Sequence, residues 1–359
     1  MSYGFIVKVS ENVLPELLEQ YNIPTAPVIF RGNQNYQSVS KHFIENIVKV
    51  AEKIEKLLKL NMPIIMTEEQ HQSHNISTSC NLCKNKFSNM NHKVADHCHL
   101  SSEFRQTLCN TCNLKLQVPN FIPCFLHNLS NYDAHFIVIE LGYDANKITV
   151  IPNSEEKFIS FSKYISNKFS IRFIDTFRFM ATSLSKLATN LLTPRLEKFR
   201  ETAKHFTNED MPLVTRKGVY PYEYTYNWQK LEDITLPSEA HFYSTLKEKH
   251  IVDEEYKHAL TVWDHFDCKT LGEYNDLYLK IDILLLADVF QNFRDICNST
   301  YGLDPAFYFT APGFSFDCML KHTGVKLKLL YIDIIFPFRI IKLIKFFSFT
   351  CSKFKNFVF

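Results

Sequence analysis

The chain has 359 residues, of which 46% are hydrophobic and 22% are charged, and its formal net charge at pH 7 is +2. This composition is typical of a globular protein with more than one domain and excludes a disordered or fibrous chain. Because positive and negative charges nearly cancel, any contact with nucleic acid must come from local patches of charge and not from an overall basic field.

The ten cysteines do not indicate secretion, because no charged region, apolar core and small-residue cleavage site open the sequence. Four of them form Cys-x-x-Cys pairs near histidines, which is typical of zinc ligands in a reducing compartment. The apolar stretch 332–350 carries Arg339, Lys342 and Lys345 together with Pro337, which argues against a membrane-spanning helix. We therefore expect an intracellular protein without membrane contact.

The N-terminal part of the chain predicts a small structural unit. Short β-rich runs at residues 4–9 and 27–31 predict two neighbouring strands. Between Ser38 and Leu60 apolar residues recur with helical spacing, which predicts a helix that packs on these strands. Residues 1–66 contain no cluster of acids, histidines or cysteines, so no chemistry is assigned to them.

Two cysteine pairs, Cys80-Asn-Leu-Cys83 and Cys109-Asn-Thr-Cys112, bracket a His-rich segment. Each pair fits a tight turn that directs two thiolates toward one tetrahedral ion, so the four residues together predict a zinc site. The alternative is that these cysteines pack by chance as small apolar side chains.

Further polar side chains lie inside and just after this bracket. With four thiolates available, Asp96, His97, His99 and Asn113 are surplus to zinc binding. Such a set suits a one-metal nuclease, in which Asp and Asn oxygens hold magnesium while a neutral His deprotonates water. The alternative is that Cys98, His97 or His99 replaces one thiolate in a structural zinc knuckle.

The chain next predicts a corner at which a strand gives way to a helix. An apolar strand ends at Asn128, and Asp133 begins an apolar helix. A carboxylate at such a corner is well placed to bind a metal at the edge of a sheet. Asn128 and Tyr132 are of types that contact a sugar-phosphate end and stack on a base.

Three elements are predicted downstream of this corner. Residues 148–175 predict an antiparallel meander of strands, and residues 182–191 predict an amphipathic helix with a Thr or Ser cap. Residues 272–290 predict a buried helix, on which Tyr278 and Asp282 lie on one face. A buried acid needs a partner, and a metal ion is one; an incidental acid on a core helix is the alternative.

The cysteine-rich stretch resembles a known nuclease family. In residues 80–113 the order Cys-x-x-Cys, Asp-His-x-His, Arg and Cys-x-x-Cys-Asn is similar to the recombination endonuclease VII type of His-Me nuclease. This resemblance implies that Asp96 and Asn113 hold magnesium, that His97 is the general base, and that the four cysteines hold zinc. Cys98 stands where that family usually has an acid, which favours a structural zinc knuckle over an active nuclease.

Four further segments together resemble the exonuclease region of family-B DNA polymerases and the stretch that follows it. Residues 127–133 (His-Asn-Leu-Ser-Asn-Tyr-Asp) and 278–282 (Tyr-Leu-Lys-Ile-Asp) are similar to its second and third exonuclease motifs. Ser183-Leu184 is similar to the element of that family that contacts single-stranded DNA, and residues 301–313 are similar to the segment leading to the polymerase palm. The detail is closest to protein-primed polymerases of viruses, organellar plasmids and Maverick or Polinton transposons, whose transposon members carry an endonuclease VII-like insert.

The resemblance implies an α/β, ribonuclease-H-like 3′–5′ exonuclease domain with a mixed sheet, interrupted by a small zinc-binding insert. In that family two magnesium ions bind the acids of three motifs and activate a water that attacks the terminal phosphodiester. The implied magnesium ligands are Asp133 and Asp282, and Tyr278 would orient the water. The implied DNA-binding residues are Asn128, Tyr132, Ser183 and Leu184. Intact relatives also work with a terminal priming protein.

Two parts of such a polymerase are missing from the sequence. The one Asp-x-Glu, at Asp253, follows the second motif and is therefore in the wrong order for the first exonuclease motif, and nothing after Gly313 supplies the palm carboxylates. The expected units are 1–66 as the first part of the exonuclease-like domain, 67–118 as the insert, 119–300 as the rest of that domain, 301–330 as the start of a linker to the palm, and 331–359 as an atypical tail.

We therefore expect a truncated DNA-directed DNA polymerase fragment that takes part in the DNA replication of a virus or mobile element, and that is nuclear if a transposon encodes it. It would bind DNA, lack nucleotidyl transfer and have an incomplete exonuclease site. The alternatives are a zinc-stabilised His-Me endonuclease centred on Asp96, His97 and Asn113, or a zinc-dependent DNA-binding module without catalysis.

Overall fold

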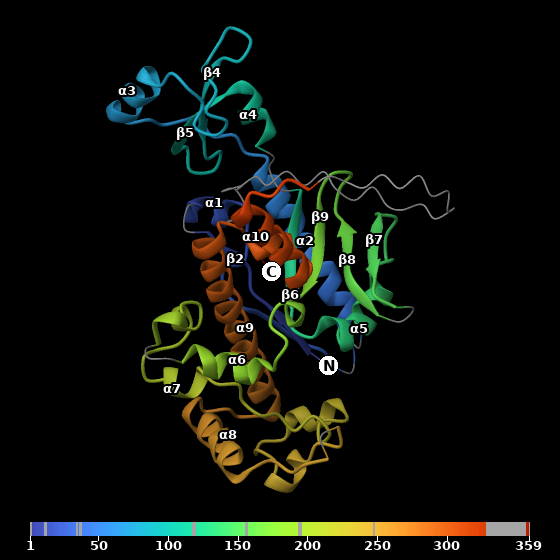
Figure 1. Ribbon diagram of the computed structural model, residues 1–359. Helices are drawn as coiled ribbons and strands as arrows, with labels where there is room; N and C mark the ends of the chain where they lie inside the picture. Colours follow the sequence, from blue (N-terminus) through green and yellow to red (C-terminus); the bar gives the residue numbers. More distant parts are fainter. Residues whose placement is uncertain are drawn as a thin grey trace, which may run out of the picture.

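The computed structural model describes residues 2–10, 13–33, 35, 38–116, 120–154, 157–192, 196–246, 248–327 and 357–358 (Figure 1). The atypical tail predicted for residues 331–359 lies outside the described residues, apart from the short strand at 357–358. None of the helices in the described ranges is both long and apolar enough to cross a membrane.

A four-stranded mixed sheet forms the centre of the larger part of the molecule. Its strands are β6 (Phe121–Leu126), β7 (Ile148–Pro152), β8 (Phe158–Tyr164) and β9 (Ser170–Asp175). They lie in the order β6-β9-β8-β7; β6 and β9 are parallel, and the other two pairs are antiparallel. The meander predicted for residues 148–175 is confirmed, and so is the mixed sheet of an α/β protein.

Helices cover both faces of this sheet, because alternate side chains of a strand point to opposite faces. The covering helices are α2 (Val39–Leu58), α5 (Ala134–Glu140) and α9 (Leu271–Tyr301). Ile171 and Phe173 of β9 belong to the core that contains α2 and α5. Ile174 faces the other side and packs with Phe125 and Phe290, whose ring centroids are 4.1 Å apart. α9 therefore lies directly on the face opposite α2.

The N-terminal residues form the predicted pair of neighbouring strands, since β1 and β3 are antiparallel partners. The elements here are β1 (Ser2–Phe5), β2 (Lys8–Val9), α1 (Pro15–Gln20), β3 (Val28–Arg31) and β10 (Phe357–Val358), which pairs with β2. The helix predicted between Ser38 and Leu60 is α2. Ile44, Ile47 and Ala51 are fully buried on its inner face, which is the spacing of an amphipathic helix.

The cysteine-rich stretch folds as a separate small module that stands beyond one end of the sheet (Figure 1). Its elements are α3 (Glu68–Ile76), β4 (Lys93–His97), β5 (Phe104–Cys109) and α4 (Asn110–Lys115). β4 and β5 form an antiparallel hairpin, with an irregularity between Asp96 and His97. Leu108 and three of the four cysteines make up its small core. α3 opens with a capping box between Thr67 and Gln70.

Further helices follow the sheet. They are α6 (Leu184–Leu191), α7 (Met211–Val214), α8 (Asp253–His265) and α10 (Ala311–Thr323). Short 3-10 turns lie at η1 (Leu129–Asn131), η2 (Thr176–Arg178), η3 (Leu196–Lys198), η4 (Thr202–Lys204), η5 (Trp228–Glu232), η6 (Glu239–Phe242) and η7 (Pro305–Phe307). The helix predicted for residues 182–191 is confirmed as α6, and Ser183 caps it.

The helix predicted for residues 272–290 is the first two thirds of a longer one. α9 begins after Thr270, whose hydroxyl accepts a hydrogen bond from the amide of Glu273, and it runs on to Tyr301. It continues past Phe290 because Arg294 and Cys297 remain buried at helical spacing. It ends at Gly302, whose φ of 62° is the left-handed conformation that terminates helices.

Candidate nuclease site and metal centre

The four predicted zinc ligands come together. The sulfur atoms of Cys80, Cys83, Cys109 and Cys112 all lie within 4.8 Å of one another, and the Cys83 and Cys109 sulfurs are 3.9 Å apart. Zinc–sulfur bonds of about 2.3 Å place tetrahedral thiolates roughly 3.8 Å apart. The geometry and the donor set therefore fit one zinc ion, as the spacing of the cysteines predicted.

Local backbone turns explain why the cysteines converge. The amide of Lys84 donates to the carbonyl of Cys80, and Lys84 adopts a φ of 62°, which closes the first turn tightly. In the second turn the Cys109 sulfur accepts from the amide of Cys112 at the start of α4. Burial opposes ionisation of Cys80, but hydrogen bonds from the backbone of Cys83 and Cys109 lower the pKa of its thiol to about 6. A thiol that ionises this readily is a good metal ligand.

The predicted one-metal nuclease set lies in the same module, but its members are otherwise engaged. The buried carboxylate of Asp96 forms an ion pair with Arg105, and Nε2 of His97 lies 3.0 Å from the carbonyl oxygen of Met62. Asn113 is half-buried on α4, and no described contact joins it to Asp96 or His97. Among the described residues the four cysteines are the one group of three or more Cys, His, Asp or Glu placed to share a metal.

A cavity of about 560 Å³ lies where the end of β6, the start of α6 and the middle of α9 meet. Five predicted site residues line it: Asn128, Asp133, Ser183, Leu184 and Asp282. These residues come from three separate stretches of sequence, and the tertiary structure brings them to one place. The two predicted tyrosines are not among the described lining residues: Tyr132 is 64% exposed, and Tyr278 is buried.

The corner that carries Asn128 and Asp133 is held by a residue that sequence reasoning missed. Asp175, at the end of β9, is 1% exposed, and its carboxylate accepts hydrogen bonds from the amides of Asn128 (2.9 Å), Ser130 (3.0 Å) and Phe177 (3.0 Å). These bonds stabilise the left-handed conformation of Asn128, whose φ is 68°. An acid directly after an apolar strand was the available signal.

Asp133 is an unusual acid because it is largely withdrawn from water and faces a second carboxylate. Burial, and then the charge of Asp175, raise the pKa of Asp133 to about 6. Because ionisation of this acid is costly in the free protein, a nearby cation would stabilise its carboxylate form. Its position at the N-terminal end of α5 also favours negative charge.

Asp282 already has a cationic partner, Lys217, which sequence reasoning also missed. The two side chains form an ion pair, and Oδ1 of Asp282 is buried without a hydrogen-bond partner in the described part of the chain. Burial raises the pKa of Asp282, and the charge of Lys217 opposes this. The hydroxyl of Tyr278 lies 2.9 Å from that of Tyr222, and Nζ of Lys217 is 4.9 Å from the Tyr278 ring.

The N-terminal strand supplies an apolar part of the cavity wall. Gly4, Phe5 and Ile6 line it, and a Cβ on Gly4 would lie 2.3 Å from Cδ1 of Ile283, so this backbone sits directly against α9. Asp133 and Asp282 are the two acids among its described lining residues.

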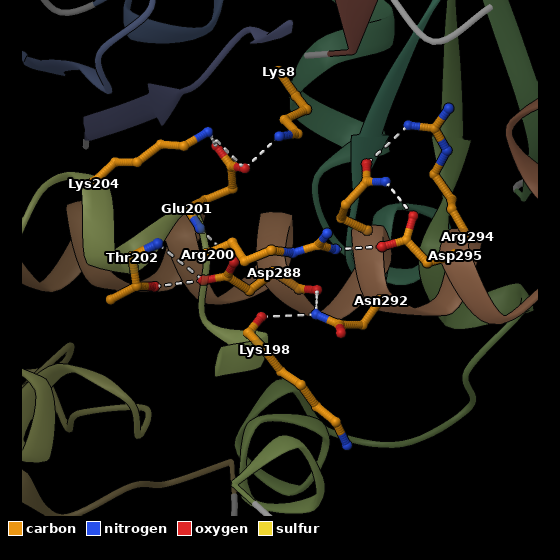
Figure 2. A network of polar contacts seen from close by, with 11 residues as sticks. Lys8, Lys198, Arg200, Glu201, Thr202, Lys204, Asp288, Asn292, Arg294 and Asp295 are labelled. Carbon is orange, nitrogen blue, oxygen red and sulfur yellow. Dashed lines mark hydrogen bonds and ion pairs between the residues drawn. The ribbon is translucent and has the colours of Figure 1, made fainter. Parts of the chain in front are cut away.

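A polar network attaches α9, the helix that carries Asp282, to the segment around η4 (Figure 2). Asp288 accepts hydrogen bonds from the amides of Glu201 (2.7 Å) and Thr202 (3.0 Å) and from the Thr202 hydroxyl (2.7 Å). Glu201 in turn forms ion pairs with Lys8 of β2 and Lys204 of η4. Burial raises the pKa of Asp288 to about 6 in spite of these hydrogen bonds.

The fold and the site define a mixed α/β protein with a four-cysteine metal module and a cavity bearing two acids. Residues 119–334 match the family described as DNA polymerase type B, organellar and viral, and residues 56–132 match recombination endonuclease VII. Because the first match covers more than half of the chain, the chain belongs to the organellar and viral type B DNA polymerase family. No curated protein and no solved structure matches the chain significantly.

Membership of this family implies that the chain binds DNA. The endonuclease VII match covers the whole four-cysteine module and extends into the Asn128 corner. Endonuclease VII domains bind zinc, so the match agrees with the metal that the cysteine geometry fits.

Proposed function

We propose that the chain is the exonuclease-like part of a protein-primed type B DNA polymerase, with a ribonuclease-H-like fold, and that its cavity receives the 3′ end of single-stranded DNA. One observation carries this proposal: Asn128, Asp133, Ser183, Leu184 and Asp282 line a single cavity although they come from three sequence motifs. The match over residues 119–334, which contain all three motifs, supports it.

The cavity offers the chemistry that a strand end requires. The side chain of Asn128 supplies a donor and an acceptor for a sugar or phosphate, and Ser183 adds a hydroxyl at the start of α6. Leu184 and Phe177 supply apolar surface for a base. Tyr132 is 64% exposed at the same corner, where it is available to stack on a further base.

We propose that the exonuclease activity of this chain is weak or absent. The described lining residues supply two acids, and Lys217 already neutralises one of them. Magnesium, if bound, would stabilise negative charge on a phosphodiester; the chain itself holds Asp133 by the Asp175 corner and Asp282 by α9. Tyr278 keeps its predicted role as the water-orienting residue of an intact site, although its hydroxyl meets Tyr222 in this chain.

We propose that the four-cysteine module is a structural zinc knuckle that adds DNA-binding surface. The Asp96–Arg105 ion pair supports this role, because the carboxylate predicted to hold magnesium is already neutralised. Its second oxygen is buried without a partner in the described structure, so an endonuclease centred on Asp96 and His97 is the second candidate. Cleavage of branched DNA that is lost in His97→Ala but retained in Asp282→Ala would favour that candidate.

The combination of a polymerase-type region with an endonuclease VII-like insert supports an origin in a Maverick or Polinton transposon or a virus, and a place in its DNA replication. On this proposal a terminal priming protein is a partner of the intact relatives, and a transposon-encoded protein acts in the nucleus.

Binding of single-stranded DNA tests the cavity proposal. Asn128→Gly removes the amide but tolerates the positive φ, so the corner should persist. Loss of one or two hydrogen bonds should weaken binding of a fluorescent oligonucleotide with a free 3′ end about five- to tenfold. Asn22→Gly, at an exposed residue that also has a positive φ (50°), is the control and should bind normally. Equal affinity of both variants would overturn the proposal.

A nuclease assay tests the state of the catalytic site. The wild-type chain should release few or no 3′ mononucleotides in the presence of magnesium. Rapid magnesium-dependent release that disappears in Asp133→Asn would show that the two acids are sufficient for catalysis and that the incomplete-site proposal is wrong. Binding by Asn128→Gly is read without magnesium, so the two tests fail independently.

A further inference from the structure

Arg172 is a half-buried cation that has no anionic partner among the described residues. Its guanidinium carbon lies 3.5 Å from the centroid of the Phe121 ring and 4.7 Å from that of Phe309. Neither phenylalanine offers a strong hydrogen-bond acceptor, and no hydrogen bond or ion pair of the Arg172 side chain occurs with any residue that the structure describes. Arginine carries five N–H donors in a fixed plane, so this group can bind an external acceptor.

Three other arginines that are at least partly buried have acceptors among the described residues. Arg105 pairs with Asp96, and Arg294 forms a two-pronged contact with Asp304. Arg178 donates to the hydroxyl of Ser130 and to a backbone carbonyl. A guanidinium withdrawn from water loses hydration, and these three regain it through protein acceptors.

Arg172 remains charged at neutral pH. Burial lowers the pKa of its guanidinium to about 10, whereas the charge of Tyr164 raises it. The two ring contacts hold the guanidinium by cation–π attraction, which orients a planar group without using its N–H donors. The group is therefore preorganised for an anion that brings several acceptor oxygens of its own.

The location of Arg172 separates it from the cavity. Phe121 and Ser170 are register partners at the first positions of the parallel strands β6 and β9, and Arg172 packs on Phe121. Asn128 and Asp175 lie at the opposite ends of the same strands. The four-cysteine module stands beyond the end at which β6 begins (Figure 1).

We propose that Arg172 binds a phosphodiester of the DNA backbone, in a second DNA-contact site at the module end of the sheet. The required ligand is an anion with two or more exposed oxygens, and DNA is the ligand class that family membership implies. The contact would fix the direction in which a duplex leaves the protein, without reading its sequence. This inference rests on DNA binding by the family and is independent of the cavity proposal.

Salt-dependent binding of a fluorescent 20-base-pair duplex without a single-stranded end tests the site. Each phosphate contact contributes about 0.9 to the slope of log K against log salt concentration for duplex DNA. Arg172→Gln should weaken binding about tenfold at low salt and reduce the slope by about one. Arg172→Lys keeps the charge but loses the planar fork, so it should keep the slope and lose only part of the affinity.

Lys49→Gln removes one positive charge from an exposed position of α2, on the opposite face of the sheet, and should change neither affinity nor slope. Circular dichroism and thermal unfolding establish that each variant is folded. The proposal is overturned if Arg172→Gln binds the duplex with the wild-type slope, whether or not the stability of the variant falls. The arginine would then only attach the Phe309 segment to the sheet or bind an acidic protein segment.

Discussion

Replacement of Asp175 by asparagine should damage the corner that carries Asn128 and Asp133. One carboxylate oxygen accepts from the amides of Asn128 and Phe177, and the other accepts from the amide of Ser130. Asparagine exchanges one of these oxygens for an NH2 group. In its least costly orientation the amide oxygen keeps the first two hydrogen bonds, and the NH2 group faces the amide of Ser130.

The magnitude follows from that one mismatch. Ser130 is buried, so its amide cannot turn to water, and an unsatisfied buried donor costs about 1–3 kcal/mol. Loss of the Asp175 charge also weakens the two hydrogen bonds that remain. One gain opposes this: the Asp175 charge is the second cause of the raised pKa of Asp133, so in the variant that pKa should fall toward its ordinary value.

Urea unfolding should therefore show Asp175→Asn to be less stable than the wild type by about 1–3 kcal/mol. Amide hydrogen exchange should show faster exchange at Ser130 than at residues of β8. Asp267→Asn is the matched control, because the Asp267 side chain is 78% exposed and accepts no buried amide, so its stability should match the wild type. Wild-type stability of Asp175→Asn with a protected Ser130 amide would refute the assigned role of the carboxylate.

Three other predictions concern the metal module, the buried network and the sheet. Cys80→Ala or Cys109→Ala should abolish binding of about one zinc ion per chain and unfold the module, as measured by metal analysis and limited proteolysis, while α2 and the main sheet persist. Burial raises the pKa of Asp288 to about 6 in the folded protein, whereas in the unfolded chain this carboxyl releases its proton near pH 4. The stability of the fold should therefore fall as the pH rises from about 4 to 6. Asp288→Asn should flatten this pH dependence, as measured by urea unfolding. Lys163 is fully buried on β8 and forms an ion pair with Asp144, whose side chain is 26% exposed. Lys163→Met should lower the free energy of unfolding by about 1–3 kcal/mol and not more, because water can solvate the Asp144 carboxylate that loses its partner. A neutral or stabilising effect in urea unfolding would contradict this.

The local features of this protein could be predicted from its sequence. Helix α2 and the strands within residues 148–175 follow from apolar spacing, because each element buries one face or one stripe. The cysteine centre follows from two tight turns, since each fixes a pair of thiolates over a few residues. The corner at Asn128 and Asp133 was also placed correctly, because the end of an apolar strand and the start of an apolar helix are local features of the sequence.

The chemical state of those predicted residues was decided only by the tertiary structure. Lys217 pairs with Asp282, Asp175 accepts from the amide of Asn128, and Asp288 accepts from the amide of Glu201. In each of these contacts the two residues are far apart in sequence. Arg172 has no anionic partner among the residues that the structure describes, and two rings distant from it in sequence, Phe121 and Phe309, pack against its guanidinium. Spacing along the chain determines which side chains a helix or turn presents, whereas burial and charge pairing depend on segments that meet only when the sheet and α9 pack together.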